Sequence, residues 1–497
     1  MTEKLSQDQV ENLSRCADVV MEIASAAGLD PYPIEFHLVP ATIMYEFGAY
    51  GIPGRFSHWT HGKAYWQMKT MYDYGLSKIY ELVINNDPAQ AFLMENNDLT
   101  QNKVVIGHVV AHVDFFKNNI SFKNTNRQMV EVAGLHADRV KNYGFKEGDE
   151  EVEAFLDSVL AIQQNIDTSF FGGNLDSIKT REVEDKEPKP PSSKYDDLFE
   201  LGQRKIEVPK RKRPQSPPQE TVDLLAVLAE HSKYLTDWQK DLILIVRDEM
   251  RYFVPQMMTR IMNEGWATYW HLRFMRGLAD RGLVTDGEYI KFADLHAGVV
   301  VSSRRSINPY LVGWRIFEDV NDKKEGKYAQ EMKRKGKKEY DWLGQEIDPE
   351  SYQGRKDYDV KWIRENIPSD QAFLRNYLTG QLVEELDLYT YASENDQWVI
   401  VEKDWQKVRD AAVKSMDNFG HPLIKIPPNG VDYNSNGELE LVHQWDGTDL
   451  DLPYAEKTLL HVYKLWGRPV HLQTKNSEGG LMLSCQDGEK VESKKIG

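Results

Sequence analysis

Residues 105–119 read VIGHVVAHVDFFKNN, an apolar stretch that carries two histidines four residues apart. Its apolar residues recur at helical spacing, so the stretch predicts a buried α-helix. Because one helical turn takes about 3.6 residues, His108 and His112 project from the same face, one turn apart. Two imidazoles placed in this way can share a metal ion, but helices that only build a core also contain such pairs. The rest of the sequence has to decide between the two interpretations.

The stretch differs at one position from HExxH, in which two histidines bind zinc and the glutamate acts as the base of a metallopeptidase. Here the residue after His108 is Val109, whose side chain cannot accept a proton. Eighteen residues separate His112 from Glu131, and this resembles the ligand spacing of the gluzincin type of zinc peptidase. The resemblance implies a zinc ion held by His108, His112 and Glu131.

A second stretch, IMNEGWATYWH at 261–271, contains the carboxylate that position 109 lacks. Its NEGWA portion resembles the helix that carries the glutamate ligand in aminopeptidase-type gluzincins. Glu264 is therefore either an alternative third ligand or the general acid/base, and His271 follows nearly two turns later on the same face as an orienting or proton-donating group. If Glu264 is the ligand, Glu131 or Asp114 must serve as the base.

The interpretation without a metal remains open for each of these residues. Buried charges are costly unless they are paired, and Arg251 or Arg260 could hold Glu264 in a purely structural ion pair. The stretch SHWTHGKAYW (57–66) offers a further histidine pair, and SRRSINPYLVG (303–313) offers polar groups that could bind a substrate carboxylate or an oxyanion. Each of these two stretches alone is more typical of a structural role.

Helical periodicity dominates the chain, including the segment YGLSKIYELVI at 74–84. We therefore expect a mainly α fold, in which a large body with gluzincin-like helices carries a small α+β domain at the C-terminus. Composition predicts four regions: a helical region with the HxxxH helix at 1–173, a charged, proline-rich linker or excursion at 174–220, a helical region with the NEGWATYWH helix and an exposed excursion (321–341) at 221–394, and the small α+β domain at 395–497.

Charge and composition exclude several classes of function. The formal net charge of -17 argues against binding to nucleic acid. Cys16 and Cys485 lie at opposite ends, so we expect no disulfide framework and a reducing compartment. The polar N-terminus lacks the features of a signal peptide, and we find no apolar run of about 18 to 20 residues that would span a membrane. The sequence therefore predicts a cytoplasmic protein without a transmembrane segment.

Longer motifs indicate a family. The segments FGAYGIPGRFSHW, HVVAHVDFFKNN, IMNEGWATYWH, NGELEL and LWGRPVH resemble the stage V sporulation protein R (SpoVR) family, and the match runs from about residue 30 to 475. The resemblance implies a role in forming the spore cortex, the modified peptidoglycan layer of bacterial endospores. It supplies neither a reaction nor ligand assignments, which rest on the spacing of the residues and on the likeness to gluzincins.

Two hypotheses of different classes follow. The first is a zinc-dependent hydrolase of peptidase or amidase type, which acts on a peptidoglycan precursor or another peptide-like substrate. Zinc would polarise the carbonyl and activate a water molecule, and Glu264 would take the proton with help from His271. The second is a non-catalytic regulatory or scaffold protein of zincin-like ancestry. It would act through a partner kinase or the envelope-synthesis machinery, and the metal would only stabilise its fold.

Overall fold

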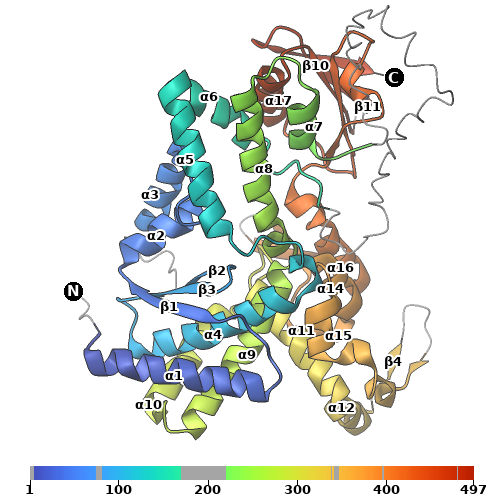
Figure 1. Cartoon of the computed structure of the whole chain (residues 1–497). Helices are drawn as coiled ribbons and strands as arrows, with labels where there is room; N and C mark the ends of the chain where they lie inside the picture. Colours follow the sequence, from blue (N-terminus) through green and yellow to red (C-terminus); the bar gives the residue numbers. More distant parts are fainter. Residues whose placement is uncertain are drawn as a thin grey trace, which may run out of the picture.

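The computed structural model describes residues 5–73, 81–168, 220–336, 338–340, 346–394, 397–477 and 479–496 of the chain. The linker predicted at 174–220 lies outside these residues, except for Glu220. The described part contains seventeen α-helices and, near its C-terminus, a five-stranded sheet (Figure 1). This confirms the predicted fold class, a mainly helical body with a small C-terminal α+β region.

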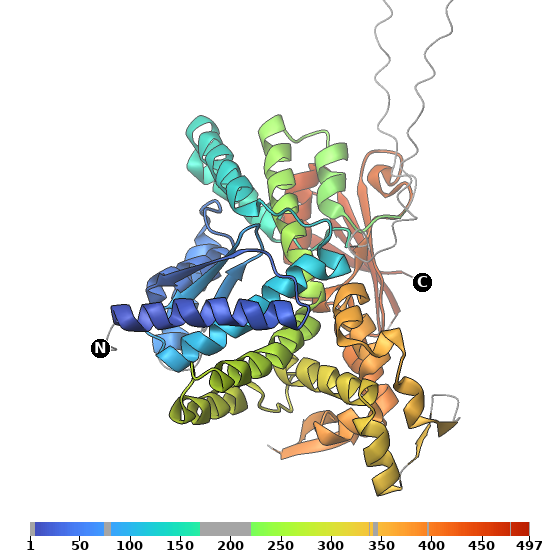
Figure 2. The same ribbon diagram turned by 60° about the horizontal axis from the view of Figure 1, so that its bottom comes forward.

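The larger hydrophobic core surrounds two helices, α4 (Leu99–Asn118) and α9 (Arg260–Asp280), which pack against each other. Both helices are buried on nearly every side, as expected for a helix whose apolar residues are not confined to one stripe. Asp98 fixes the start of α4, because its side chain accepts a hydrogen bond from the backbone N–H of Gln101 in a capping box. Figure 2 shows α1 lying along this helix pair. The surrounding helices are α1 (Gln7–Ala26), α10 (Asp286–Val299), α11 (Pro309–Lys324), α13 (Val360–Asn366), α14 (Asp370–Tyr377), α15 (Gly380–Glu385) and α16 (Trp405–Lys414).

Helices α9 and α11 touch backbone to backbone. A Cβ atom on Gly265 would lie 2.3 Å from the carbonyl carbon of Gly313, and one on Gly313 would lie 2.1 Å from the carbonyl oxygen of Ile261. These separations are far below van der Waals contact, so only glycine fits on either side of the crossing. The contact fixes the rotation of α9 and therefore the direction in which Glu264 projects.

A small sheet lies beside α4 and was not expected from the sequence. Its order is β1-β3-β2, with β1 and β3 parallel and β2 antiparallel to β3. The prediction of a helix at 74–84 is wrong for the described residues 81–84, which form β2. Glu81, the first residue of β2, is thereby placed next to α4. The strands are β1 (Ile34–Val39), β2 (Glu81–Ile84) and β3 (Ala89–Met94), and α2 (Ala41–Tyr50) and α3 (Trp59–Asp73) lie between β1 and β2 in the chain.

The C-terminal sheet shares a second hydrophobic core with helices from the middle of the chain. Figure 1 shows these helices and the sheet together at the top of the molecule. The sheet has the order β12-β11-β10-β9-β8. The helices are α5 (Met129–Glu147), α6 (Asp149–Leu160), α7 (Leu224–His231), α8 (Asp237–Met258) and α17 (Leu452–Trp466), and the strands are β8 (Ile424–Lys425), β9 (Leu439–His443), β10 (Val470–Asn476), β11 (Gly479–Cys485) and β12 (Val491–Ile496).

The predicted start of the C-terminal region lies between two paired strands. The C-terminal region was expected to begin at 395, but the hairpin of β6 (Thr390–Glu394) and β7 (Gln397–Glu402) crosses that position. Helix α16 then packs against α14 in the larger core, so the sheet region begins near Ile424. The strand-like segments after 395 suggested a new region, but the apolar face of α16 still packs in the larger core.

The segment 321–341, predicted as an exposed excursion, is helical over most of its described residues; about half of these are exposed, and one face is buried. It contains the end of α11 and helix α12 (Lys327–Lys335), and Lys323 is only 1% exposed. The ammonium group of Lys323 lies 2.8 Å from the Asp319 carboxylate and over the ring of Tyr328. A buried lysine is tolerated when it is paired in this way. Residues 337 and 341 lie outside the described part of the chain.

The remaining described strands, β4 (Glu339–Tyr340) and β5 (Glu346–Ile347), form a two-stranded sheet. Within the described residues, we find no helix with the length and apolar character needed to cross a membrane.

Candidate metal centre

Four side chains from three elements converge at the face of α4 that meets α9. Glu81 comes from the start of β2, His108 and His112 from α4, and Glu264 from α9. Each offers one ligand atom, and these atoms all lie within 4.8 Å of one another. Both histidines are buried, whereas about a fifth of each glutamate side chain is exposed. The cluster is therefore accessible from the side of the carboxylates.

The distances inside the cluster suit ligands around a metal ion. Nε2 of His108 lies 3.3 Å from Oε2 of Glu264 and 3.3 Å from Oε1 of Glu81, and Nε2 of His112 lies 3.4 Å from Oε2 of Glu264. Hydrogen bonds that involve charged groups are shorter, about 2.7–2.9 Å. Zinc bonds of about 2.0–2.1 Å in a tetrahedral arrangement place neighbouring ligand atoms about 3.3 Å apart. The observed distances are those expected between neighbouring ligand atoms of one zinc ion, and they are longer than charge-assisted hydrogen bonds.

Asn263, Glu264 and Gly265 are consecutive in α9 and have three different roles. The amide oxygen of Asn263 lies 3.0 Å from Nδ1 of His112, which directs Nε2 of that ring to the cluster. Glu264 contacts both histidines, and Gly265 forms the close crossing with α11. Outer partners of this kind fix the ring orientation of a histidine ligand.

A chain of three imidazoles leads away from the cluster. Nδ1 of His108 lies 3.0 Å from Nδ1 of His271, and Nε2 of His271 lies 3.1 Å from Nδ1 of His296. If His108 presents Nε2 as a ligand atom, its Nδ1 carries the proton and donates to His271. His271 must then donate from Nε2 to His296, so the cluster sets the tautomers of the whole chain. Burial and the neighbouring imidazoles lower the pKa of His271 well below its ordinary value, which keeps the ring neutral.

Glu264 and the two histidines of the cluster interact strongly. Burial opposes ionisation of Glu264, but hydrogen bonds and charge from His108 and His112 hold the pKa of its carboxyl well below the usual range. Burial lowers the pKa of His112, yet Glu264 outweighs this and raises it. Burial and the adjacent carboxylates raise the pKa of Tyr310, which hydrogen-bonds to Glu264 and keeps its proton. Two carboxyl groups beside two imidazoles form an N/O ligand set of the kind that zinc accepts.

The cluster opens into a cavity of about 510 Å³. Glu81, His108 and Tyr310 line it beside the cluster, and residues 295–309, from the last turn of α10 to the first residue of α11, supply much of the remaining lining. A volume of this size falls within the range of small-molecule sites, about 300–1,000 Å³. A water molecule and a substrate group can therefore reach the cluster together.

The structure brings together His108, His112, Glu264 and His271 from the predicted site. It does not bring Glu131 to them: this residue is exposed in the first turn of α5, which packs against α6 and α8 in the other core. The eighteen-residue spacing does not place Glu131 beside the histidines here, because α5 packs against α6 and α8 and not along α4. Asp114 is not available as a base either, since its buried carboxylate is bound to Arg364 at 2.7 Å.

The sequence interpretation missed Glu81, Asn263 and His296. Asn263 stands inside the IMNEGWATYWH stretch, and an asparagine next to a candidate ligand is a usable signal. Glu81 belongs to a strand that was assigned to a helix, and no motif connects it with α4. Only the pairing of β2 with β3 places it beside His108.

A mainly helical protein with two histidines and two glutamates at the junction of its central helices belongs among candidate metalloproteins. Residues 7–421 match the family model described as "SpoVR like protein", and residues 426–477 match the one described as "SpoVR-like C-terminal domain". The chain therefore belongs to the SpoVR family, as its motifs predicted, and this membership associates it with sporulation. The gap between the two matches coincides with the start of the sheet region near Ile424.

A relative in Escherichia coli (strain K12), called "Uncharacterized protein YcgB", is 26% identical over 484 residues, which cover 93% of this chain and 91% of the relative. No solved structure matches the chain.

Proposed function

We propose that the protein is a metal-dependent hydrolase of amide bonds, with a zinc ion bound by His108, His112 and Glu264. The observation that carries this proposal is the convergence of four ligand atoms within 4.8 Å at the wall of a large cavity. Two histidines and one carboxylate are the ligands of many zinc peptidases, which leave one position for water. Zinc bound there would polarise a substrate carbonyl and lower the pKa of its water.

In this proposal Glu81 is the general base. From the sequence, Glu264 was either the acid/base or an alternative third ligand, and its contacts with both histidines favour the ligand position. Glu81 contacts only His108 of the pair and lines the cavity, where water would bind. A carboxylate from β2 thus takes the role that Val109 cannot fill. A general base must lie within hydrogen-bond reach of the water, and the 4.8 Å limit of the cluster allows this.

Two further side chains assist. Tyr310 keeps its proton and lines the cavity, so its hydroxyl can donate a hydrogen bond to Glu264 or to the oxyanion of the substrate. His271 contacts Nδ1 of His108, whereas the carboxylates contact Nε2 of the same ring. We therefore assign His271 a positioning role. The substrate we propose is peptide-like. Family membership makes the peptide of a peptidoglycan precursor, used in the spore cortex, our first candidate.

A second candidate function rests on the number of ligands. Two histidines and two glutamates complete a tetrahedral set, and zinc sites with four protein ligands are structural. In that case the metal would only hold β2, α4 and α9 together, and the protein would act by binding a partner such as a kinase. The role of Glu81 decides between the candidates, because a fourth ligand leaves no position for water.

Metal content and turnover measured together separate these candidates. We expect about one zinc per chain in the wild type and none in Glu264→Gln, whereas Glu81→Gln should retain zinc and lose hydrolysis of a peptide library. Loss of zinc from Glu81→Gln would favour the structural site. No zinc in the wild type, even after refolding with excess zinc, would exclude both.

A further inference from the structure

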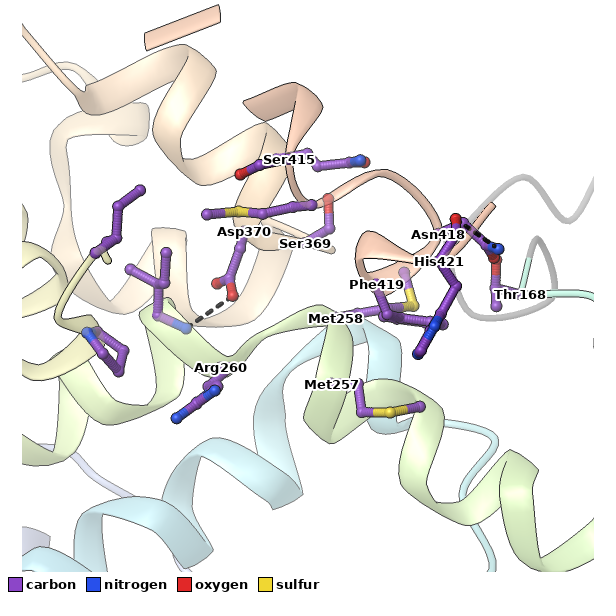
Figure 3. A pocket seen from close by; sticks show the side chains of 15 residues that line it. Thr168, Met257, Met258, Arg260, Ser369, Asp370, Ser415, Asn418, Phe419 and His421 are labelled. Carbon is purple, nitrogen blue, oxygen red and sulfur yellow. Dashed lines mark hydrogen bonds between the residues drawn. The ribbon is translucent and has the colours of Figure 1, made fainter. Parts of the chain in front are cut away.

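A second cavity adjoins the one at the metal cluster. It has a volume of about 420 Å³ and shares Arg260, Ile307 and Pro309 with the first cavity. Figure 3 shows it at the N-terminal end of α9, between this helix and the segment 415–421. Two adjoining cavities that share a wall can bind one extended ligand, and a single amino acid would fill only a part of them.

Arg260 stands where the two cavities meet. It lies four residues before Glu264 in α9, so both side chains project from the same face of the helix, one turn apart. In the described part of the chain its guanidinium makes no ion pair or side-chain hydrogen bond, and it is the only arginine or lysine among the described residues that line either cavity. It is exposed, so a ligand can reach it. A guanidinium in this position suits a carboxylate, which it can bind with two parallel hydrogen bonds.

The acidic groups nearby are already engaged. The carboxylate of Asp370 accepts hydrogen bonds from the backbone N–H groups of Ile261 and Met262, at 2.7 and 2.9 Å, and so caps α9. Figure 3 shows the Arg260 side chain directed away from it. Glu264 contacts the histidines of the cluster. The charge of Arg260 is therefore available to an anionic ligand.

The second cavity suits a peptide chain. Met257, Met258, Met416 and Phe419 line it, and flexible thioether side chains adapt to apolar groups of different shape. Ser369 adds a hydroxyl that can still donate a hydrogen bond, and Gln371 and Asn418 add amide oxygens, since their amide N–H groups already bind Asp417 and the backbone of residues 421 and 422. The lining thus combines apolar contacts with a few hydrogen-bonding groups, as ligand sites do, and its methionines suit a surface that adapts to side chains of varied shape.

We infer that the substrate is an acidic peptide that spans both cavities. Its scissile amide lies at the metal, the carboxylate of an adjacent aspartate or glutamate side chain binds Arg260, and the chain continues into the second cavity. Arg260 is then the residue that determines specificity. The placement of the amide rests on the proposed hydrolase function, whereas the binding of the carboxylate by Arg260 can be tested without turnover.

Peptide hydroxamates test the role of Arg260, because the hydroxamate binds the metal and the peptide tests the rest of the site. Two probes carry either glutamate or glutamine next to the hydroxamate, and both are titrated against the zinc-loaded full chain. We expect the glutamate probe to bind about tenfold tighter or more, as for a charge-assisted hydrogen bond. Arg260→Gln should abolish this preference. Arg305→Gln, at an exposed arginine that does not line either cavity, should keep it.

Probe length tests the second cavity. Ser415 is exposed and lines it, so Ser415→Trp should fill space without disturbing a core. We expect this variant to weaken a glutamate probe of five residues about tenfold and to leave a probe of two residues unchanged. Equal binding of the glutamate and glutamine probes to the wild type would overturn the inference and leave the metal site intact. If neither probe binds zinc-loaded protein, the proposed hydrolase site fails as well.

Discussion

Two pairs of histidines in this protein look alike in sequence and differ in their surroundings. His108 and His112 are four residues apart, and His58 and His61 are three apart beside the start of α3. The first pair meets two carboxylates from β2 and α9. In the second pair, His58 lies 3.2 Å from Asp157, whereas burial and the charge of Arg55 lower the pKa of His61 to about 4. An imidazole pair becomes a candidate metal site only where other elements add carboxylates.

The origin of the carboxylates explains the difference. Near α3, Asp157 also accepts a hydrogen bond of 2.6 Å from the indole of Trp59, and Arg55 is paired with the buried Glu249. The carboxylates of Asp157 and Glu249 are therefore already bound to other side chains of that region. Near α4, Glu81 and Glu264 have the histidines as their partners. Histidine spacing is a local property of the sequence, whereas the supply of carboxylates depends on tertiary contacts.

The largest effect should come from Glu264→Gln. A neutral amide removes one ligand and one negative charge, so we expect zinc affinity to fall by more than the 10- to 100-fold typical of residues that only support a ligand. The measurement is a competition titration with a zinc chelator. His61→Gln, at the other histidine pair, is the matched control and should leave zinc affinity unchanged. Equal losses in both variants would contradict the assignment of the site.

Gly265→Ala should have the next largest effect. The added Cβ would meet the backbone of Gly313, which cannot move as a side chain can, so we expect a loss of about 3 kcal/mol in the free energy of unfolding. Gly62 in α3 has no atom within 4 Å of a built Cβ. Gly62→Ala should therefore stabilise the protein by about 0.5–1 kcal/mol. Urea denaturation of both variants measures this difference in the free energy of unfolding. Equal values for Gly265→Ala and Gly62→Ala would contradict the close crossing of α9 and α11.

His271→Asn should weaken the metal site without removing a ligand. The imidazole of His271 sets the tautomer and orientation of His108. Loss of such an outer partner typically lowers metal affinity about 10- to 100-fold. His58→Asn, which alters the other pair, should leave affinity unchanged. Zinc binding by His271→Asn equal to that of the wild type would show that the imidazole chain does not support the cluster.

The smallest effect concerns pH and His61. The pKa of this histidine is about 4 in the folded protein and near the ordinary value of 6.5 when unfolded. The unfolded state binds more protons between these values, so stability is greatest above about pH 6.5 and falls as the pH drops towards 4. His61 should account for about 2 kcal/mol of the loss between pH 7 and pH 5. Urea denaturation at both pH values should show a smaller loss in His61→Gln; an unchanged loss would assign the effect to other groups.

The sequence predicted the parts of the site that depend on helical geometry. His108 and His112 share a face because of their spacing, and Glu264 and His271 were found in one motif. Glu131 failed because spacing along the chain predicts a contact only if the next helix folds back, and α5 instead packs in the second core. Glu81 was missed because β2 has only four residues, and this short segment forms a strand through its pairing with β3. Neither the packing of α5 in the second core nor the pairing of β2 with β3 leaves a local pattern in the sequence.

The same distinction applies to the fold. Long amphipathic helices such as α1 could be predicted from periodicity and capping residues. The parallel pairing of β1 with β3 joins segments about 50 residues apart, so periodicity could not reveal it. The burial of Lys323 depends on the aromatic rings of Tyr328 and Tyr352 around it, which the charge-rich composition of the segment concealed.

The glycine crossing of α9 and α11 couples the metal cluster to the wall of the two cavities. Glu264 and Arg260 are on α9, and Tyr310 is at the start of α11. Because the two backbones are in direct contact, neither helix can rotate or slide without carrying the other. A shift of α11 that changes the shape of the cavity would therefore also move Glu264, the proposed metal ligand on α9. Divergence in substrate preference should therefore accumulate in the connection between α10 and α11, where side chains can change while the helix pair is preserved.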